Sequence, residues 1–173
     1  MSAHREEIWV PGMPEPISHF VHVVRAGRLV FVSGCVARDA EGRTVGAGDI
    51  VAQARQVHEN LKACLAAAGA TFADVCKVTV FLTRIGDREA VNTVRQEYFG
   101  ASRPASTLIE ISRLVSDDLM IEIEATAVLP EPRSGGAARR VTAKARPVAK
   151  TRGGVKARAG TAARRGTVRG RRR

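Results

Sequence analysis

The sequence predicts an α+β domain in which two helices cover one face of a mixed β-sheet. Three observations favour this class. Short β-branched runs alternate with two longer segments whose apolar residues recur every three or four positions. The segments follow the order hairpin, helix, strand, helix, strand, strand, and a strand–helix–strand unit within one sheet almost always crosses over right-handedly. The chain has 173 residues, 45% of them hydrophobic, which suffices for one packed core.

The first half of the domain is predicted to contain a hairpin and a helix. Residues 22–34, HVVRAGRLVFVSG, form two β-prone runs around the turn sequence RAGR. Residues 49–69 change to a helical period, with Asp49 suited to the N-cap and Gly69 to the position just beyond the helix. His58 is expected on the surface of this helix.

The second half of the domain is predicted to add a strand at residues 74–83 and a helix at residues 87–99. Two further strands are expected at residues 103–114 and 120–129. Near the N-terminus, the apolar residues 8–10, IWV, are expected to form an edge strand that caps the core. The proposed elements therefore extend over residues 8–129.

One face of this sheet has no helix to cover it. On the last strand, Ile121 and Ile123 alternate with Glu122 and Glu124, so the two pairs point to opposite faces. A chain of this size hides such a face most simply against another copy of itself. The sequence therefore predicts a homo-oligomer.

The positive charge of the chain is concentrated at its C-terminal end. Residues 133–173 contain 15 Lys and Arg and no acid, whereas residues 1–132 contain 13 Lys and Arg against 17 acids. The tail also lacks aromatic residues, Leu and Ile, so we expect a globular domain at residues 1–132 and a disordered tail at residues 133–173. Its cations favour sequence-independent association with DNA or RNA, and a merely solubilising extension is the alternative. The representative tail residues expected to contact nucleic acid are Arg139, Arg140, Lys144, Lys150, Arg164, Arg165 and Arg171.

Neither a membrane anchor nor a metal site is expected. No stretch resembles a signal peptide or a membrane span, so we expect a cytoplasmic protein that the tail can bring to the nucleoid. Three cysteines without CxxC spacing predict reduced thiols rather than a disulfide framework or a zinc site. His19 and His22 have HxxH spacing but lack a third ligand, and His19 beside Phe20 is the better candidate for a pocket wall.

Several motifs together resemble the RidA/YjgF family of enamine/imine deaminases. They are FVSGCV, GDIVAQARQVHENLKACLAAAGATFADVCKVTVFLT, AVNTVRQEYFG, RPAST and IEIEATAV, and the resemblance extends over residues 17–128. It implies a chorismate-mutase-like single domain that forms a homotrimer, with the sheets around a barrel core and small-molecule pockets in the clefts between subunits. The activity implied is the hydrolysis of reactive 2-enamine or 2-imino acids to 2-oxo acids and ammonia, without metal or organic cofactor.

The resemblance also assigns the candidate site. Glu122 matches the glutamate that positions the attacking water, Ser33 and Gly34 match the substrate-orienting turn, and Asn92 matches an asparagine at the start of a helix. Cys35, directly after the turn, is either a pocket nucleophile or an inert small hydrophobe. The ligand-binding residues predicted in this way are Phe20, Ser33, Gly34, Cys35, Asn92, Ser106 and Leu108.

The sequence departs from the family pattern at the residue that would bind a substrate carboxylate. Ser106 stands where the family usually has an arginine, and Phe20 where it has a tyrosine. A serine offers one neutral donor in place of a planar charged fork. Arg25, Arg103 and Arg113 are candidates for a replacement cation. Two functions therefore stay open, a deaminase whose substrate is not the usual 2-imino acid, and a non-catalytic ligand-binding trimer tethered to nucleic acid by its tail.

Overall fold

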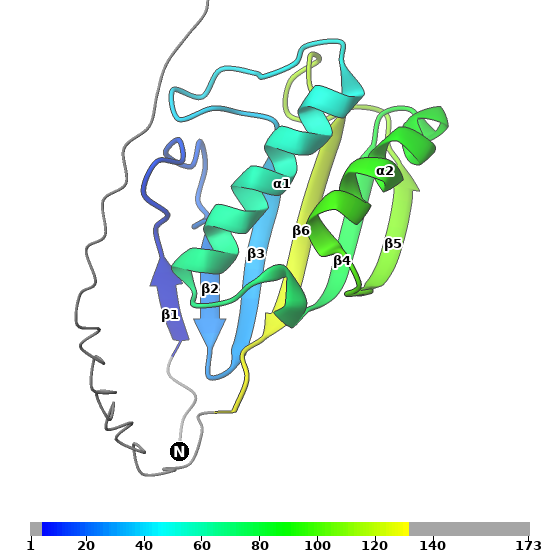
Figure 1. Cartoon of the computed structure of the whole chain (residues 1–173). Helices are drawn as coiled ribbons and strands as arrows, with labels where there is room; N and C mark the ends of the chain where they lie inside the picture. Colours follow the sequence, from blue (N-terminus) through cyan, green and yellow to red (C-terminus); the bar gives the residue numbers. More distant parts are fainter. Residues whose placement is uncertain (1–4, 132–173) are drawn as a thin grey trace, which may run out of the picture. The chain divides into compact units, whose positions relative to one another are not determined.

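A computed structural model describes residues 5–131 of the chain. They form one sheet, two α-helices and two short 3₁₀ helices, as the sequence predicts for an α+β domain (Figure 1). The tail, with all the cationic residues assigned to nucleic acid, lies outside the described residues. In chain order the elements are β1 (Arg5–Ile8), β2 (Val23–Ala26), β3 (Leu29–Val36), α1 (Ile50–Ala67), η1 (Phe72–Asp74), β4 (Val75–Leu82), η2 (Ile85–Asp87), α2 (Arg88–Phe99), β5 (Ala105–Glu110) and β6 (Ile121–Val128).

The six strands lie in the order β1-β2-β3-β6-β4-β5. Only β4 and β5 are parallel, and α2 connects them as the crossover helix. The other neighbours are antiparallel, including the predicted hairpin of β2 and β3. Figure 1 shows α1 and α2 side by side on the same face of this mixed sheet. No helix within residues 5–131 combines the length and apolar character needed to cross a membrane.

The boundaries of α1 follow from its capping residues. The Asp49 side chain accepts hydrogen bonds from the backbone N–H groups of Val51 and Ala52, at 2.9 and 3.1 Å, and so satisfies donors that the first turn leaves free. The chain leaves the helix through Gly69, whose φ of 79° suits glycine. Both residues have the roles that the sequence predicts.

The core lies between the helices and the covered face of the sheet. Alternate residues of β3, β4 and β6 point into it, among them Val30, Val80 and Ile123, which are at most 1% exposed. His58 is also fully buried, against the rings of Tyr98 and Phe72. The prediction that His58 lies on the helix surface is therefore wrong, because α2 and η1 pack over that side of α1.

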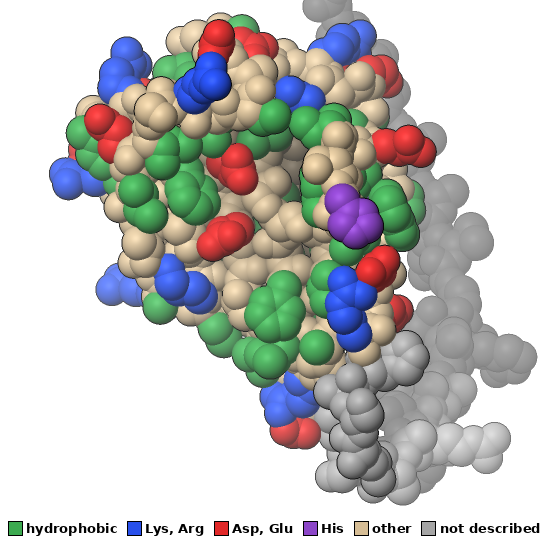
Figure 2. Space-filling view, turned by 180° about the vertical axis from the view of Figure 1, so that it is seen from behind, with side chains coloured by type: hydrophobic (Ala, Val, Ile, Leu, Met, Phe, Trp, Pro, Cys, Tyr) green, Lys and Arg blue, Asp and Glu red, His purple; other side chains and the backbone are tan. Residues whose placement is uncertain are grey.

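The opposite face of the sheet carries no helix and mixes apolar with charged side chains (Figure 2). Phe31 on β3 and Ile109 on β5 are 43% and 41% exposed. The strand register places Glu122 opposite Phe81 and Phe81 opposite Ile109, so all three point to this face. Trp9 differs from expectation, because β1 ends at Ile8 and the Trp9 side chain is 59% exposed rather than a cap on the core.

Candidate functional site

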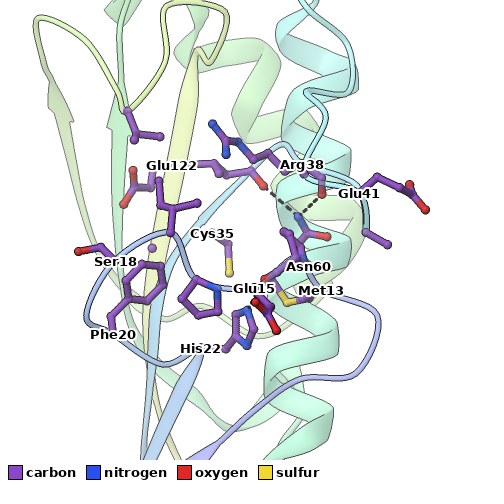
Figure 3. Close-up of a pocket in the computed structure, with 18 residues that line it drawn as sticks. Met13, Glu15, Ser18, Phe20, His22, Cys35, Arg38, Glu41, Asn60 and Glu122 are labelled. Atoms are coloured by element: carbon purple, nitrogen blue, oxygen red, sulfur yellow. Dashed lines mark hydrogen bonds between the residues drawn. The ribbon is translucent and has the colours of Figure 1, made fainter.

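The main pocket lies between the loop that precedes β2 and the paired ends of β3 and β6, where β3 ends and β6 begins. Its volume is about 670 Å³, and we call it the Glu122 pocket (Figure 3). Four of the predicted site residues line it: Phe20, Gly34, Cys35 and Glu122. Residues that are more than 80 positions apart in the chain thus meet in one pocket, because β3 and β6 are hydrogen-bonded neighbours.

A local irregularity in β3 makes room for the glutamate. The pairing of β3 with β6 shifts register between Val32 and Cys35, which places Gly34 at the irregularity. A Cβ atom on Gly34 would lie 1.8 Å from Oε1 of Glu122, so only glycine leaves space for the carboxyl group in this position. The Ser-Gly sequence therefore has a steric role in the pocket.

Ser33 has a supporting position beside this glycine. Its hydroxyl donates to the carbonyl of Val21 at 2.7 Å, and its N–H donates to the carbonyl of His22 at 3.0 Å. These two bonds join β3 to the residues just before β2, at the end of the loop that lines the pocket. Next to them, His22 Nδ1 accepts from the N–H of Val10 at 3.3 Å, so His22 is a structural histidine that lines the pocket, while His19 is exposed.

Glu122 is half-buried, and no group in residues 5–131 donates a hydrogen bond to it. Burial raises the pKa of Glu122 above its usual value, and the negative charge of Glu124 raises it further. A carboxylate with a raised pKa is a better proton acceptor, and its unpaired oxygens remain available to water or a ligand.

Arg38 and Asn60 also line the pocket, although the sequence did not identify either. Asn60 donates to the carbonyls of Val36 and Arg38, both at 2.9 Å, and so ties α1 to the end of β3. Arg38 Nη2 lies 3.4 Å from the Ser116 hydroxyl, and its buried Nε has no partner among the described residues. The sequence could have pointed to Asn60, because it is a polar residue within the apolar stripe of a helix. No comparable feature of the sequence marks Arg38.

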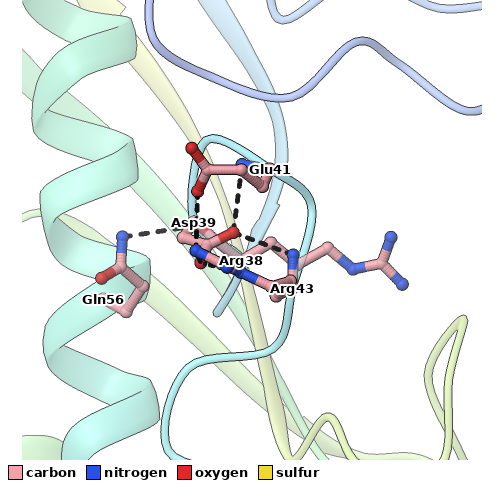
Figure 4. Close-up of polar contacts among 5 residues, drawn as sticks. All are labelled: Arg38, Asp39, Glu41, Arg43 and Gln56. Atoms are coloured by element: carbon pink, nitrogen blue, oxygen red, sulfur yellow. Dashed lines mark hydrogen bonds and ion pairs between the residues drawn. The ribbon is translucent and has the colours of Figure 1, made fainter.

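The loop after Arg38 is fixed by one carboxylate (Figure 4). Asp39 accepts from the backbone N–H groups of Glu41 and Arg43 and from the Arg43 guanidinium. These contacts, led by the backbone hydrogen bond from Arg43, lower the pKa of Asp39. Gln56 of α1 donates to the carbonyl of Arg38 at 3.5 Å. The wall of the pocket that carries Arg38 and Glu41 is therefore held at both ends.

Cys35 is buried beside the pocket. Its contact with the Cys64 thiol and its burial raise the pKa of Cys35 well above the usual range. The thiol is therefore protonated at neutral pH, whereas a nucleophilic cysteine needs a lowered pKa. The geometry favours the second of the two interpretations, in which Cys35 is a small hydrophobe.

The remaining predicted residues lie elsewhere. Asn92 lines a second pocket, on α2. Ser106 and Leu108 pair with Val78 and Val80, which point into the core, so both belong to the helix-covered face of the sheet, opposite to Glu122. Within one chain Ser106 thus does not lie across from Glu122. Its hydroxyl contacts Arg95 instead.

The sequence matches the family described as Endoribonuclease L-PSP over residues 12–129. It is 43% identical to a RutC family protein of Pyrococcus horikoshii over 71% of this chain and 97% of that protein. It is 37% identical to the 3-aminoacrylate deaminase RutC of Acinetobacter baylyi, over 70% and 97% of the two chains. A 2-iminobutanoate/2-iminopropanoate deaminase of Dermatophagoides farinae is 31% identical over 70% of this chain and 94% of its own.

Solved structures give the same result for the fold. The YjgF gene product of Escherichia coli superposes with a TM-score of 0.66 at 34% identity, over 71% of this chain and 98% of its own. TdcF of Escherichia coli, solved with bound serine, superposes with a TM-score of 0.67 at 32% identity, over 72% and 99%.

Proposed function

Because the chain belongs to the Endoribonuclease L-PSP family, some members of which are named deaminases, we propose that it hydrolyses a small enamine or imine to a carbonyl compound and ammonia. The observation that carries the proposal is the half-buried, unpaired Glu122 carboxylate above Gly34 in a pocket of about 670 Å³. This volume suits a small metabolite. An enamine reaches the same reaction after protonation at carbon gives the protonated imine.

The reaction requires one water and one proton acceptor. Water adds to the carbon of the protonated imine while Glu122 takes a proton from the water, which gives a neutral carbinolamine with a new C–O bond. The protonated Glu122 then returns the proton to nitrogen. The C–N bond breaks, ammonia leaves, and Glu122 takes the hydroxyl proton as the carbonyl forms. Burial raises the pKa of Glu122 and thereby matches it better to these proton transfers.

The experiment follows ammonia released from enamines and imines generated in the assay, with 3-aminoacrylate and 2-iminobutanoate as the first substrates. Glu122→Gln keeps the shape of the side chain and removes the base, so we expect turnover to fall by about two orders of magnitude or more. Glu124→Gln, two residues along the same strand, is the matched control and should retain most of the turnover at pH 8. Ammonia release at the buffer rate by the unaltered protein would contradict the proposal, and a stabilising ligand recovered unchanged would then favour the non-catalytic binding function.

We also propose that the protein is a homotrimer assembled through the bare face of the sheet. Support comes from Phe31 and Ile109, apolar side chains that remain about two-fifths exposed on that face. Light scattering on the full chain should give a mass near three times 18.5 kDa. A monomeric mass that does not change with concentration would contradict this assembly.

The charge of the tail favours a second, independent function. Its 15 cations and lack of acids support non-specific binding to DNA or RNA, with affinity that falls steeply as salt is raised. Mobility shifts of a mixed-sequence duplex should be strong for the full chain at low salt and absent for a chain ending at Pro132. Equal affinity of the two proteins would refute a role for the tail.

A further inference from the structure

The mouth of the Glu122 pocket is lined by apolar side chains that the domain leaves uncovered. Ile17, Phe20 and Val115 all line the pocket, and their exposed fractions range from 46% to 65%. Ile17 and Phe20 come from the loop before β2, and Val115 comes from the loop between β5 and β6. Phe20 and Glu122 are walls of the same pocket (Figure 3). Large apolar side chains gathered at one opening form a surface that an apolar part of a ligand can cover.

Two buried polar side chains of the pocket wall, His22 and Asn60, are already bonded within the chain. The Asn60 amide donates to two backbone carbonyls, and its oxygen accepts from Gln56 at 2.9 Å. Nδ1 of His22 accepts from the N–H of Val10 at 3.3 Å, and Nε2 contacts the carbonyl of Pro14 at 3.0 Å. Neither side chain therefore offers a free donor to a ligand carboxylate.

The carboxylates of the pocket give it a negative charge. Glu41 is paired with Arg43 at 2.9 Å, whereas Glu15 and Glu122 form no ion pair with any described residue. Burial and then the negative charge of Glu124 raise the pKa of Glu122, so the nearby charge that acts on this carboxyl group is negative. A ligand carboxylate at Glu122 would be repelled, while the protonated imine of the proposed reaction would be attracted.

Arg38 is the one Lys or Arg that the described part of the chain contributes to the pocket, and its charge acts on a different acid. Its Nη2 lies 3.4 Å from the Ser116 hydroxyl. Hydrogen bonds from Thr44 and Ser116 lower the pKa of Asp118, and the charge of Arg38 contributes in the same direction. Arg38 therefore compensates Asp118, in the loop before β6, rather than Glu122.

We propose that the substrate of the Glu122 pocket is an imine or enamine with an apolar substituent and without a carboxylate, and that Ile17, Phe20 and Val115 bind the substituent. This inference rests on the proposed deaminase function, to which it adds the substrate class. The apolar group is removed from water at the mouth of the pocket, and the protonated imine lies at the Glu122 carboxylate. Both 3-aminoacrylate and 2-iminobutanoate carry a carboxylate and should therefore be the poorer substrates.

Two imines that differ only in the carboxylate test the substrate class. An amine oxidase generates phenylacetaldehyde imine from phenethylamine, and an amino acid oxidase generates 2-imino-3-phenylpropanoate from phenylalanine. The measurement is the ammonia that the full chain releases above the buffer rate. We expect kcat/KM to be about tenfold or more higher for phenylacetaldehyde imine. An equal or higher value for the imino acid would overturn the inference and leave the deaminase function standing.

Binding of stable carbonyl compounds separates the inference from the proposed function. Phenylacetone and phenylpyruvate differ only in a methyl group against a carboxylate, and both are titrated into the full chain and followed by the NMR chemical shifts of Phe20 and Gly34. Phenylacetone should bind about tenfold more tightly, and Glu122→Gln should reduce this preference severalfold because it removes a repelling charge. Tighter binding of phenylpyruvate that Arg38→Gln abolishes would make the pocket a carboxylate site and overturn the inference.

Truncation of one exposed side chain tests the apolar mouth of the pocket. Phe20→Ala should weaken phenylacetone binding about tenfold, because the ligand loses the ring that covers it. Ile85→Ala is the matched control, since Ile85 is also 46% exposed but does not line the pocket, and it should bind like the unaltered protein. Unchanged binding in Phe20→Ala, or an equal loss in Ile85→Ala, would overturn the inference. Binding that depends on Phe20 without ammonia release from either imine would keep the ligand class and refute the deaminase function.

Discussion

The two pockets of this domain have opposite charge, and burial acts on both in the same physical way. The Glu122 pocket has three carboxylates, Glu15, Glu41 and Glu122, and one arginine in its wall. The second pocket, which lies on α2 and which we call the Arg95 pocket, has two arginines, Arg95 and Arg103, and no carboxylate. Burial raises the pKa of Glu122 and lowers the pKa of Arg95, because removal from water disfavours the charged form of each.

The difference gives the two pockets different chemistry. The acids of the Glu122 pocket repel an anionic ligand, whereas the cations of the Arg95 pocket attract one. Of the two pockets, only the Glu122 pocket has a carboxylate in its wall, and the proposed hydrolysis needs such a proton acceptor.

The largest expected effect comes from closing the space above Gly34. In Gly34→Ala the new methyl carbon would lie 1.8 Å from Oε1 of Glu122, and the flexible carboxyl group must move away. A displacement of this size costs on the order of a hundredfold in turnover, while the melting temperature should change little. Gly86→Ala is the control, since a Cβ at Gly86 has no neighbour within 4 Å. Full activity in Gly34→Ala would show that the position of Glu122 is unimportant.

The next effect concerns His58, which is buried behind the Arg95 pocket. Burial lowers the pKa of His58, and the nearby Arg95 charge contributes in the same direction. The unfolded chain therefore binds a proton at a higher pH than the folded chain, and stability should fall as the pH drops from 7 to 5. Each unit of pKa difference corresponds to about 1.4 kcal/mol, so urea unfolding at the two pH values can resolve it.

Two variants identify the origin of this pH dependence. His58→Gln removes the titrating ring and should flatten the decline in the free energy of unfolding between pH 7 and 5. His19→Gln, at an exposed position, should leave the decline unchanged. Equal slopes in the unaltered and His58→Gln proteins would mean that other groups cause the acid sensitivity.

A smaller effect concerns the N-cap of α1, whose loss should lower stability without changing either pocket. Asp49→Ala removes the cap that accepts from Val51 and Ala52, and we expect a loss of about 1 kcal/mol in the free energy of unfolding. Asp117→Ala, an exposed loop residue, should change it by less than about 0.5 kcal/mol. Turnover should persist, because Asp49 lines neither pocket. A loss of turnover in the folded variant would reveal coupling between this end of α1 and the Glu122 pocket.

Local sequence patterns were sufficient for the elements and for part of the site. The period change at residues 49–69 and the Asp49 and Gly69 caps define α1, because capping depends on neighbours in the chain. The Gly34–Glu122 approach could not be predicted from spacing, since it depends on the register between two strands. It was reached only through a resemblance between motifs.

The residues that were missed depend on packing between elements. His58 lies four residues after Ala54 and three before Leu61, so its place on the buried face was readable, but a second helix was needed to cover it. Arg95 likewise follows Asn92 by one turn, which puts both on one face of α2. Its meeting with Ser106 requires the crossover of α2 onto β5, and no local pattern encodes that contact.

The smallest expected effect is electrostatic and tests what raises the pKa of Glu122. Burial is the main cause that raises the pKa of Glu122, and the charge of Glu124 is the second. If the carboxylate is the active form, turnover should fall as the pH drops through that pKa. Glu124→Gln removes only the second cause, so the acidic limb of the turnover profile should move to lower pH by a fraction of a unit while the plateau at pH 8 stays unchanged. An equal shift in Glu89→Gln, on α2, would point to a general change of net charge; a shift confined to Glu124→Gln would show that the acidic limb reports the local field on the bare face of the sheet.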